Sequence, residues 1–500
     1  MKTTVFGITI CVMVPLSGVG LSPCCAAPDS QPADQFTLVY NVNNSGYIDV
    51  CGCKRKEVKQ GSLTRRASFL TQLRATGREL LLLDGGSAFF KIGKRVPKEL
   101  RGEAIRKAQL IVESYNRMGY QAMAVGPFDL AAGLDVTRKL EKRAKFPFLS
   151  ANLFDKDTGK RIFKPHVVFN VNGVRVGVVG LTLATMTRPF LQKVGPNIDA
   201  RDPMEYLQKS LAELADDNTD VVVLLSHVRE ETNWKMIDEI PGIQIVVDPY
   251  INYGNHHTWI KDPEWLTRRG DSVFLRSDGQ GARMGVLDVE MTKKRQPLVS
   301  MVDVTEIEER IVANEANEDE KLKLAKWKGF NSFYFQKISL EPHFRTDPGI
   351  DLLVEEWKKN VDPSKIAEHK SELRPEEYLT ASKCAKCHQT QHDWWKKTKH
   401  STALASLERT GDHQRFDCIG CHTLGYGKAF LDTTNVGQYA NVQCESCHGT
   451  NVAHAADPHN NPYRKITRQD CIWCHNKEQT LKNFPFLQSR RLVACPSSKS

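Results

Sequence analysis

Between Cys384 and His475 the chain repeats one five-residue pattern four times. The copies read Cys384-Ala-Lys-Cys387-His388, Cys418-Ile-Gly-Cys421-His422, Cys444-Glu-Ser-Cys447-His448 and Cys471-Ile-Trp-Cys474-His475. C-x-x-C-H is the attachment signal for c-type haem, in which both thiols bind the porphyrin and the His ligates the iron. The repeat therefore predicts four c-type haems, with the His of each copy as the proximal iron ligand.

Paired C-x-x-C units also build zinc sites, which is the alternative interpretation. Zinc requires no His directly after every second Cys, so haem is favoured. A segment of about ninety residues with few Leu, Ile or Val runs cannot bury a large apolar core unaided. We expect porphyrins to fill the interior of a small, mostly α-helical domain at residues 380–480, with a tail at residues 481–500.

The chain has 500 residues and a net charge of +10, which suggests two to four domains. It shows no basic stripe flanked by aromatic residues, so nucleic acid is not an expected partner. A basic surface steers acidic proteins toward it, so we expect a redox partner protein that is acidic at its docking face. The sequence leaves open whether the chain forms a homo-oligomer.

Residues 1–27 resemble a secretory signal peptide, because an apolar run at Val5–Val14 is followed by small residues at Ala26 and Ala27. The run is too short to cross a bilayer, and no later stretch is long enough. We therefore expect no transmembrane anchor after cleavage. Export to the periplasm or beyond agrees with c-type haem, which is attached outside the cytoplasm.

Of the 14 Cys residues, eight belong to the four motifs. The leader contains Cys11, Cys24 and Cys25, and lipid attachment at Cys24 or Cys25 is an alternative that the preceding Pro23 disfavours. The remaining three are Cys51, Cys53 and Cys495. Because three is odd, at least one thiol is expected to be free or to pair between chains.

From Phe36 onward, apolar runs alternate with amphipathic stretches. Strand-like runs occupy residues 36–42, 79–86, 121–126, 146–153, 174–181, 221–227 and 243–250. Helical patterns occupy residues 63–75, 103–118, 134–144 and 203–216. Buried strands separated by helices predict an α/β layered fold. The run at residues 272–291 predicts two antiparallel strands that close a sheet edge.

The blocks LLLLDGGSAFF, MGYQAMAVGPFDLAAGLDV, FPFLSANL, VNGVRVGVVGLT and VVVLLSHV occur in this order between residues 80 and 228. Their order resembles the calcineurin-like metallophosphoesterase domain of the periplasmic 5′-nucleotidase family, over residues 36–303. The resemblance implies an αββα sandwich with a dinuclear metal site at the strand ends. Two metals in such a site clamp a phosphoryl group and activate water.

The positions that match the family's metal ligands carry other residues. The Asp-x-His pair falls on Asn43 and Ser45, and the bridging Asp falls on Ser87, close to Asp84. The Asn-His-Glu block reads Pro127-Phe128-Asp129, the next His is kept as His227, and Gly-His-x-His becomes Gly254-Asn255-His256-His257. Asn, Ser, Pro and Phe cannot replace carboxylates and imidazoles. We therefore predict that this domain has lost most metal ligands and that hydrolysis is unlikely.

Close to the first lost ligand block, Cys51-Gly-Cys53 is followed by three basic residues. Neighbouring cations lower the pKa of a thiol and make it reactive or metal-binding. One interpretation is an accessory redox or metal site with His227 or His257. A local disulfide or two ordinary buried thiols is the alternative, and this alternative is favoured.

Residues 304–379 are rich in charge and have helical periodicity. They predict a solvated helical connector in which Trp327 and Trp357 are packing anchors. Its two His residues, His343 and His369, are expected at the surface, although either could reach a haem.

Two stretches of the haem segment resemble the tetrahaem cytochrome c family that includes the electron acceptor of hydroxylamine oxidoreductase. They read QTQHDWWKKTKHSTALASL and HGTNVAH. The resemblance implies that His400 and His454 ligate iron on its distal side. His392, His413 and His459 are the other distal candidates, and each could instead be a surface residue. One haem in that family lacks a distal His.

Iron with a His on both faces exchanges single electrons without binding substrate. We therefore expect an exported multihaem cytochrome that transfers electrons. The alternative is a multihaem oxidoreductase that acts on a small nitrogen or sulfur compound at an open haem. A 5′-nucleotidase-like hydrolase is the least favoured class.

Overall fold

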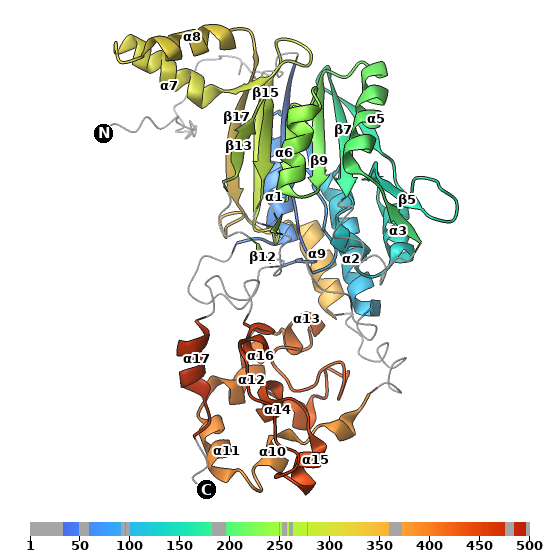
Figure 1. Ribbon diagram of the computed structural model, residues 1–500, viewed down its shortest axis with the longest axis vertical. Helices are drawn as coiled ribbons and strands as arrows, with labels where there is room; N and C mark the ends of the chain where they lie inside the picture. Colours follow the sequence, from blue (N-terminus) through green and yellow to red (C-terminus); the bar gives the residue numbers. More distant parts are fainter. Residues whose placement is uncertain are drawn as a thin grey trace, which may run out of the picture.

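The computed structural model describes residues 34–49, 60–91, 96, 101–182, 197–249, 251–252, 258–259, 264–277, 279–359, 373–475 and 485–496. The leader predicted at residues 1–27 lies outside these ranges. Figure 1 shows two parts, an α/β domain built from the described residues up to 359 and a smaller helical domain built from those between 373 and 496.

Two mixed sheets form the α/β domain. The seven-stranded sheet has the order β16 (Leu298–Ser300), β17 (Asn331–Ser339), β15 (Arg283–Glu290), β1 (Gln35–Asn41), β2 (Leu80–Asp84), β3 (Ala122–Ala124), β4 (Phe148–Leu149). The six-stranded sheet has the order β13 (Leu266–Arg269), β14 (Ser272–Arg276), β10 (Ile245–Asp248), β9 (Val221–His227), β7 (Val174–Thr182), β6 (His166–Val171). Two short ribbons pair β5 (Leu153–Asp155) with β8 (Ile198–Ala200), and β11 (Ile251–Asn252) with β12 (Thr258–Trp259).

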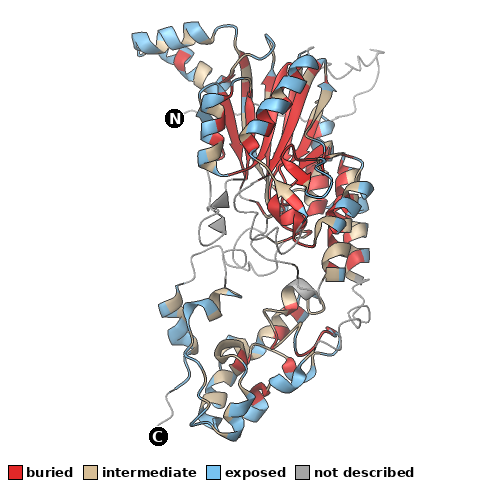
Figure 2. Cartoon of the chain, turned by 45° about the vertical axis from the view of Figure 1, so that its right-hand side comes forward, coloured by how far each residue is buried: buried red, intermediate tan, exposed pale blue. Residues whose placement is uncertain are grey.

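The sheets pack face to face, because successive side chains of a strand point to opposite faces. Leu38 and Leu83 of the first sheet belong to the same buried cluster as Val223 of the second. The outer face of the seven-stranded sheet is covered by α1 (Leu63–Arg74), α2 (Arg101–Met118), α3 (Leu134–Arg143) and α9 (Pro348–Lys359). The outer face of the six-stranded sheet is covered by α5 (Pro203–Asp216) and α6 (Glu230–Glu239). The αββα prediction is confirmed, and the buried residues concentrate in these layers (Figure 2).

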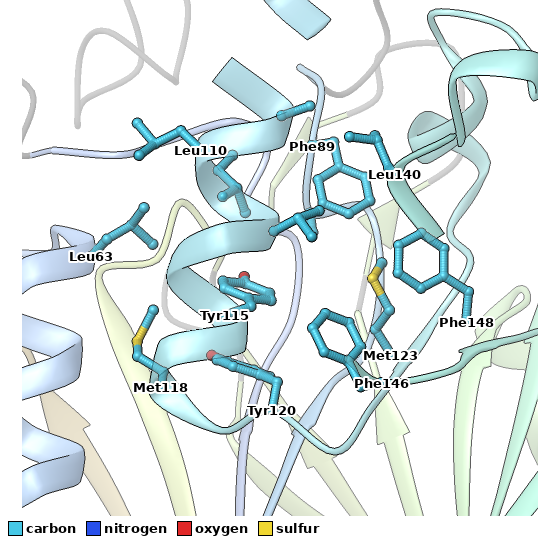
Figure 3. Close-up of a cluster of buried hydrophobic side chains, with 14 of the residues drawn as sticks. Leu63, Phe89, Leu110, Tyr115, Met118, Tyr120, Met123, Leu140, Phe146 and Phe148 are labelled. Atoms are coloured by element: carbon cyan, nitrogen blue, oxygen red, sulfur yellow. The ribbon is translucent and has the colours of Figure 1, made fainter. Parts of the chain in front are cut away.

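Aromatic packing fixes α2 on its sheet (Figure 3). The rings of Tyr115 and Tyr120 stack with their centroids 3.9 Å apart. Phe148 of β4 stacks on Phe146 at 5.9 Å and on Phe89 at 5.7 Å. Aromatic pairs at such distances add stability beyond the area they bury. This cluster lies beside the ends of β1, β2 and β3, so it supports the loops that follow those strands.

The hairpin predicted at residues 272–291 is wrong. β14 pairs with β10 and β13 in the six-stranded sheet, whereas β15 lies between β1 and β17 in the other sheet. Gly279 and Gly281, with φ of 76° and 63°, occur in the loop between the two strands. Glycine adopts positive φ without steric cost, so the chain can leave one sheet and enter the other. Strand propensity alone did not reveal this change of sheet.

The segment predicted as a helical connector is partly a strand. Helices α7 (Met301–Val312), α8 (Glu318–Trp327) and α9 agree with the prediction, but β17 adds to the seven-stranded sheet. β16 and β17 are parallel, and parallel neighbours need a crossover connection, which α7 and α8 supply. Trp357 of α9 is buried in the core of the α/β domain, which therefore extends at least to this helix.

The C-terminal domain is built from short helices, as predicted. They are α10 (Thr380–Cys384), α11 (Gln389–Lys396), α12 (Ala403–Glu408), α13 (Phe416–Ile419), α14 (Cys444–His448), α15 (Val452–Ala456), α16 (Arg468–Ile472) and α17 (Phe486–Val493). Its apolar clusters are small, one around Leu424 and Phe430 and one around Leu404 and Ile419. Across the described ranges, no helix combines the length and apolar character needed to cross a membrane.

Candidate functional site

Each C-x-x-C-H motif lies on or directly after a short helix. The His388 N–H donates to the Cys384 carbonyl at 3.0 Å, and the His475 N–H donates to the Cys471 carbonyl at 2.8 Å. Residues four apart in a helical turn lie on one face, so the first thiol and the imidazole of each of these motifs share a side. This is the arrangement that covalent attachment and iron ligation by one motif require.

A cavity of about 2030 Å³ is lined mainly by this domain, together with residues 45–49, Lys91 and Lys107 of the α/β domain. The second, third and fourth motifs contribute to its lining with Cys418, Cys421, His422, Cys444, Cys447, His448, Cys471, Cys474 and His475. The first motif adjoins this region, because the thiols of Cys384 and Cys444 share a hydrogen bond. The four motifs are therefore gathered around one region of the domain.

Two of the predicted distal residues face a motif His. The imidazole rings of His388 and His454 have centroids 6.0 Å apart and planes 18° from parallel. The rings of His400 and His475 are also 6.0 Å apart, with planes at 42°. The structure thus brings the first motif together with His454 on α15, and the fourth motif together with His400.

Backbone carbonyls orient the rings of His454 and His422. Nδ1 of His454 lies 2.9 Å from the carbonyl oxygen of Asn461, and Nδ1 of His422 lies 2.7 Å from that of Ala403. A metal-binding His commonly donates its second ring N–H to a carbonyl, which fixes the tautomer and the orientation of the ring. Both residues therefore present Nε2 as the nitrogen for a metal.

The surroundings of the imidazoles favour their neutral form. Burial lowers the pKa of His400, and the neighbouring His475 lowers it further. Burial also lowers the pKa of His448, with smaller effects from Arg464 and His388. Neutral imidazole is the form that binds metals. The lowered pKa values therefore leave His400 and His448 able to bind a metal at neutral pH.

The other distal candidates are less well placed. His459 is exposed, and the ring of His392 lies 5.5 Å from that of Trp395. His413 is partly buried, near the start of α13. Within the described ranges, no imidazole ring contacts that of His422 or His448. Within the described ranges, the second and third motifs therefore lack the imidazole partner that the first and fourth motifs have.

At the strand ends of the α/β domain, the positions that match the family's metal ligands are closely packed. Asn43, Ser45 and Ser87 have positive φ angles of 56°, 54° and 53°. The Asn43 N–H donates to the Gly86 carbonyl at 2.9 Å, and the Ser45 N–H donates to the Ser87 carbonyl at 3.0 Å. Backbone hydrogen bonds therefore join the loops after β1 and β2.

His227, at the end of β9, is fully buried beside these loops. A Cβ atom on Gly126 would lie 2.8 Å from His227 Nε2 and 2.2 Å from Ser87 Oγ, so the loop after β3 passes very close to both. Burial lowers the pKa of His227 to about 4, although hydrogen bonds with the Gly86 and Gly85 backbone oppose the shift. His227 is therefore neutral at physiological pH.

Asp129 holds two of these loops together. Its carboxylate accepts N–H groups from Gly126 and Ser87 on one oxygen, and from Ala88 and Phe89 on the other, at 2.7–3.2 Å. Burial raises the pKa of Asp129 to about 7, with a further contribution from Asp84. No group of three or more His, Cys, Asp or Glu within the described ranges could hold a metal ion. Cys51, Cys53 and His257 lie outside those ranges.

A buried polar network near these loops was not foreseen. Arg66 is fully buried and donates to the hydroxyls of Tyr115 and Tyr120 and to Asn44 Oδ1. The Tyr115 hydroxyl donates to Asp84 Oδ2 at 2.7 Å. A buried charge needs partners of this kind. Arg66 lies on the buried face of a helix, but nothing in its local sequence distinguishes it from the exposed Arg residues of the chain.

Comparison with known proteins agrees with both halves of this description. Residues 383–449 match the family model described as cytochrome c554 and c-prime, which implies haem c in this segment. The N-terminal region is 32% identical over 185 residues to a 5′-nucleotidase of Vibrio parahaemolyticus, covering 37% of this chain and 31% of that protein. It is 30% identical over 231 residues to a 5′-nucleotidase of Vibrio cholerae, covering 44% of this chain and 39% of that protein.

A 5′-nucleotidase precursor of Thermus thermophilus has a TM-score of 0.49 and 19% identity, over 65% of this chain and 59% of that one. The chain spans about a third of the Vibrio parahaemolyticus relative and about two fifths of the Vibrio cholerae relative. It therefore joins a domain similar to 5′-nucleotidases to a segment of cytochrome c554 type.

Proposed function

We propose that this protein is an exported cytochrome that transfers electrons through four covalently bound c-type haems. The observation that carries the proposal is the 6.0 Å separation within the pairs His388–His454 and His400–His475. Two metal–imidazole bonds of about 2 Å each, on opposite sides of one metal, leave the ring centres roughly this far apart. Each pair has the spacing of two axial ligands on one iron.

When bound, each haem iron takes up and releases a single electron. The chain supplies the thiols that attach each haem and the imidazoles that bind its iron. The thiols of each motif would hold the porphyrin and the motif His would bind the iron, with His454 and His400 as the second ligands at the first and fourth haems. An iron with two imidazoles has no open position for a substrate, which suits a carrier.

The four motifs are neighbours of one another, which supports transfer between haems. The thiols of Cys384 in the first motif and Cys444 in the third share a hydrogen bond. Cys471 of the fourth motif raises the pKa of Cys447 in the third, and His422 of the second motif lowers the pKa of His475 in the fourth. The first motif therefore adjoins the third, the third adjoins the fourth, and the fourth adjoins the second.

The α/β domain is proposed to dock a partner rather than to hydrolyse phosphate esters. Its similarity to 5′-nucleotidases favours hydrolysis, but the matching ligand positions carry Asn43, Ser45, Ser87, Pro127 and Phe128. These side chains cannot hold two divalent cations. With a net charge of +10, the chain suits a redox partner that is acidic at its docking face.

A second candidate function is an oxidoreductase that binds a small nitrogen or sulfur compound at one open haem. The observation that favours it is the absence, within the described ranges, of an imidazole ring in contact with His422. Spectra of the oxidised protein with nitric oxide or cyanide would reveal a ligand-reactive haem.

A spectroelectrochemical titration of the purified protein tests the carrier function. We expect four reversible one-electron steps per chain, without substrate and without change in protein mass. Fewer than three electrons per chain, or irreversible reduction, would contradict an electron carrier with four haems.

A further inference from the structure

The haem motifs follow one another along the length of the C-terminal domain. Helix α10, which ends at Cys384 of the first motif, contacts α14 of the third motif, and α14 contacts α16 of the fourth. A Cβ atom on Gly420 of the second motif would lie 3.8 Å from Trp473 Cη2 of the fourth. Figure 1 shows the same order, with α13 nearest to the α/β domain, followed by α16, α14 and α10. The first and second motifs are therefore the two ends of the series.

The first motif lies nearer to the surface than the other three. Cys387 and His388 are exposed, whereas the matching Cys and His of each other motif are only partly exposed. The same polypeptide atoms are compared in all four motifs, so the difference reflects how the chain folds around each one. The first haem would therefore be the one that a partner protein can approach most closely.

Lysines gather at this end of the series. Residues 383–399 contain one carboxylate, Asp393, and five exposed lysines that form the lysine surface, namely Lys383, Lys386, Lys396, Lys397 and Lys399. Lys396 lies 3.8 Å from Asp393, and among the residues that the structure describes the other four lysines form no ion pair. The equivalent windows of the other motifs, residues 417–433, 443–459 and 470–486, contain no excess of cations. The positive charge is therefore specific to the first motif.

Helix α11 turns its charged side outward. The Trp395 indole N–H donates to the Val442 carbonyl at 2.8 Å, so this side of α11 faces the domain. Asp393 and Lys397, four positions apart, lie on the opposite side of the helix and are exposed. Trp394 is 37% exposed next to them. A cationic surface with one exposed aromatic ring suits a transient interface, because charge guides the approach and the ring supplies apolar contact.

We propose that the lysine surface docks an acidic redox protein that exchanges single electrons with the first haem. The inference rests on the proposed function, because it requires a haem at the first motif. On contact, one electron passes between the redox centre of the partner and the first haem iron, so one centre is oxidised as the other is reduced and no bond forms or breaks. Small interfaces are typical of such electron-transfer encounters. The surface lies at the end of the helical domain away from the α/β domain, so it is separate from the docking role proposed for that domain (Figure 1).

Reduction of the oxidised holoprotein by the hydroquinone of an acidic flavodoxin, followed by stopped-flow absorbance, tests this assignment. For the wild type, the second-order rate constant should fall as ionic strength rises, because salt screens the attraction between opposite charges. In the double variant Lys386→Glu, Lys397→Glu, the rate constant at low salt should fall about tenfold. The control is Lys323→Glu, Lys326→Glu, which makes the same change of net charge at exposed positions of α8. Equal rate constants for the two double variants would overturn the proposal.

Sedimentation with phosphatidylglycerol vesicles separates a protein partner from a membrane, because clustered lysines also attract anionic lipids. At physiological salt, both double variants should bind these vesicles as the wild type does. Vesicle binding that is lost only in Lys386→Glu, Lys397→Glu, with an unchanged flavodoxin rate constant, would overturn the proposal. Both double variants should keep four reversibly reducible haems. A haem count below four in the wild type would instead contradict the proposed function, so the two failures are distinguishable.

Discussion

The imidazole rings of His388 and His454 have centroids 6.0 Å apart and nearly parallel planes, although one ends the first haem motif and the other follows the third. Nδ1 of His454 is held by the Asn461 carbonyl, so Nε2 is the nitrogen directed to a metal. Without a metal, two aligned imidazoles of which His388 is exposed and His454 only partly buried would gain little beyond aromatic contact. Under the proposed function, one iron would lie between the two rings.

Replacement of His454 by Ala should open the first haem. We expect one of the low-spin haems to become high-spin in the oxidised protein, because its iron loses one of two imidazoles. Added imidazole should restore the low-spin spectrum. His459→Ala is the matched control, because His459 is exposed on the same loop region and should leave all spectra unchanged. Equal effects of the two variants would contradict the pairing.

Loss of the third attachment site should affect more than one haem. The double variant Cys444→Ser, Cys447→Ser removes both thioether bonds of that haem, so visible absorbance should fall by about a quarter. Because Cys384 and Cys444 are adjacent, the midpoint potential of the first haem should also shift. A potential titration of the variant measures both effects. An unchanged first haem would argue against contact between these two sites.

The α/β domain should show no phosphoesterase activity. We expect background rates with Mn²⁺, Zn²⁺ or Mg²⁺ and a nucleotide or chromogenic phosphate ester, because Asn43, Ser45 and Ser87 cannot bind two cations. An active 5′-nucleotidase serves as the positive control. Metal analysis that found two tightly bound non-iron cations per chain would contradict this expectation.

The buried His227 should make the stability of the α/β domain depend on pH. Its folded pKa, near 4, lies below the ordinary value of 6.5, so the unfolded chain binds a proton more readily between these values. The contribution of His227 to stability is full above pH 6.5 and falls on acidification toward pH 4, by up to about 3 kcal/mol.

Urea unfolding followed by far-ultraviolet circular dichroism at pH 7 and pH 5 measures this effect. His227→Gln should lose part of the difference between the two pH values. His343→Gln, at an exposed position, is the control. The same pH dependence in the wild type and in both variants would show that His227 is not the responsible group.

The haem attachment sites and the αββα layers could be predicted from the sequence, because both depend on local patterns. C-x-x-C-H is a contiguous signal, and buried strands such as β9 begin with an unbroken apolar run, here residues 221–225. The predicted hairpin at residues 272–291 failed because two adjacent strands can enter different sheets when the loop between them permits it. The register of β17 depends on long-range pairing with β15, which composition does not encode.

Only part of the candidate site could be predicted, because the rest depends on contacts between residues that are far apart in the sequence. His400 and His454 were suggested by resemblance, but their partners, His475 and His388, follow only from the folded arrangement. Cys495 lies far from the motifs in sequence and was expected in a tail. Its place in the lining of the cavity depends on α17 and on the hydrogen bond between Gln391 and Pro496.

The number of covalent haems tests the central claim most directly. The protein should be produced in a host with cytochrome c maturation, extracted with acid and acetone, and weighed intact by mass spectrometry. We predict that the colour stays with the polypeptide and that the mass exceeds that of the processed chain by four haems. A mass increment of two haems or fewer would contradict the account.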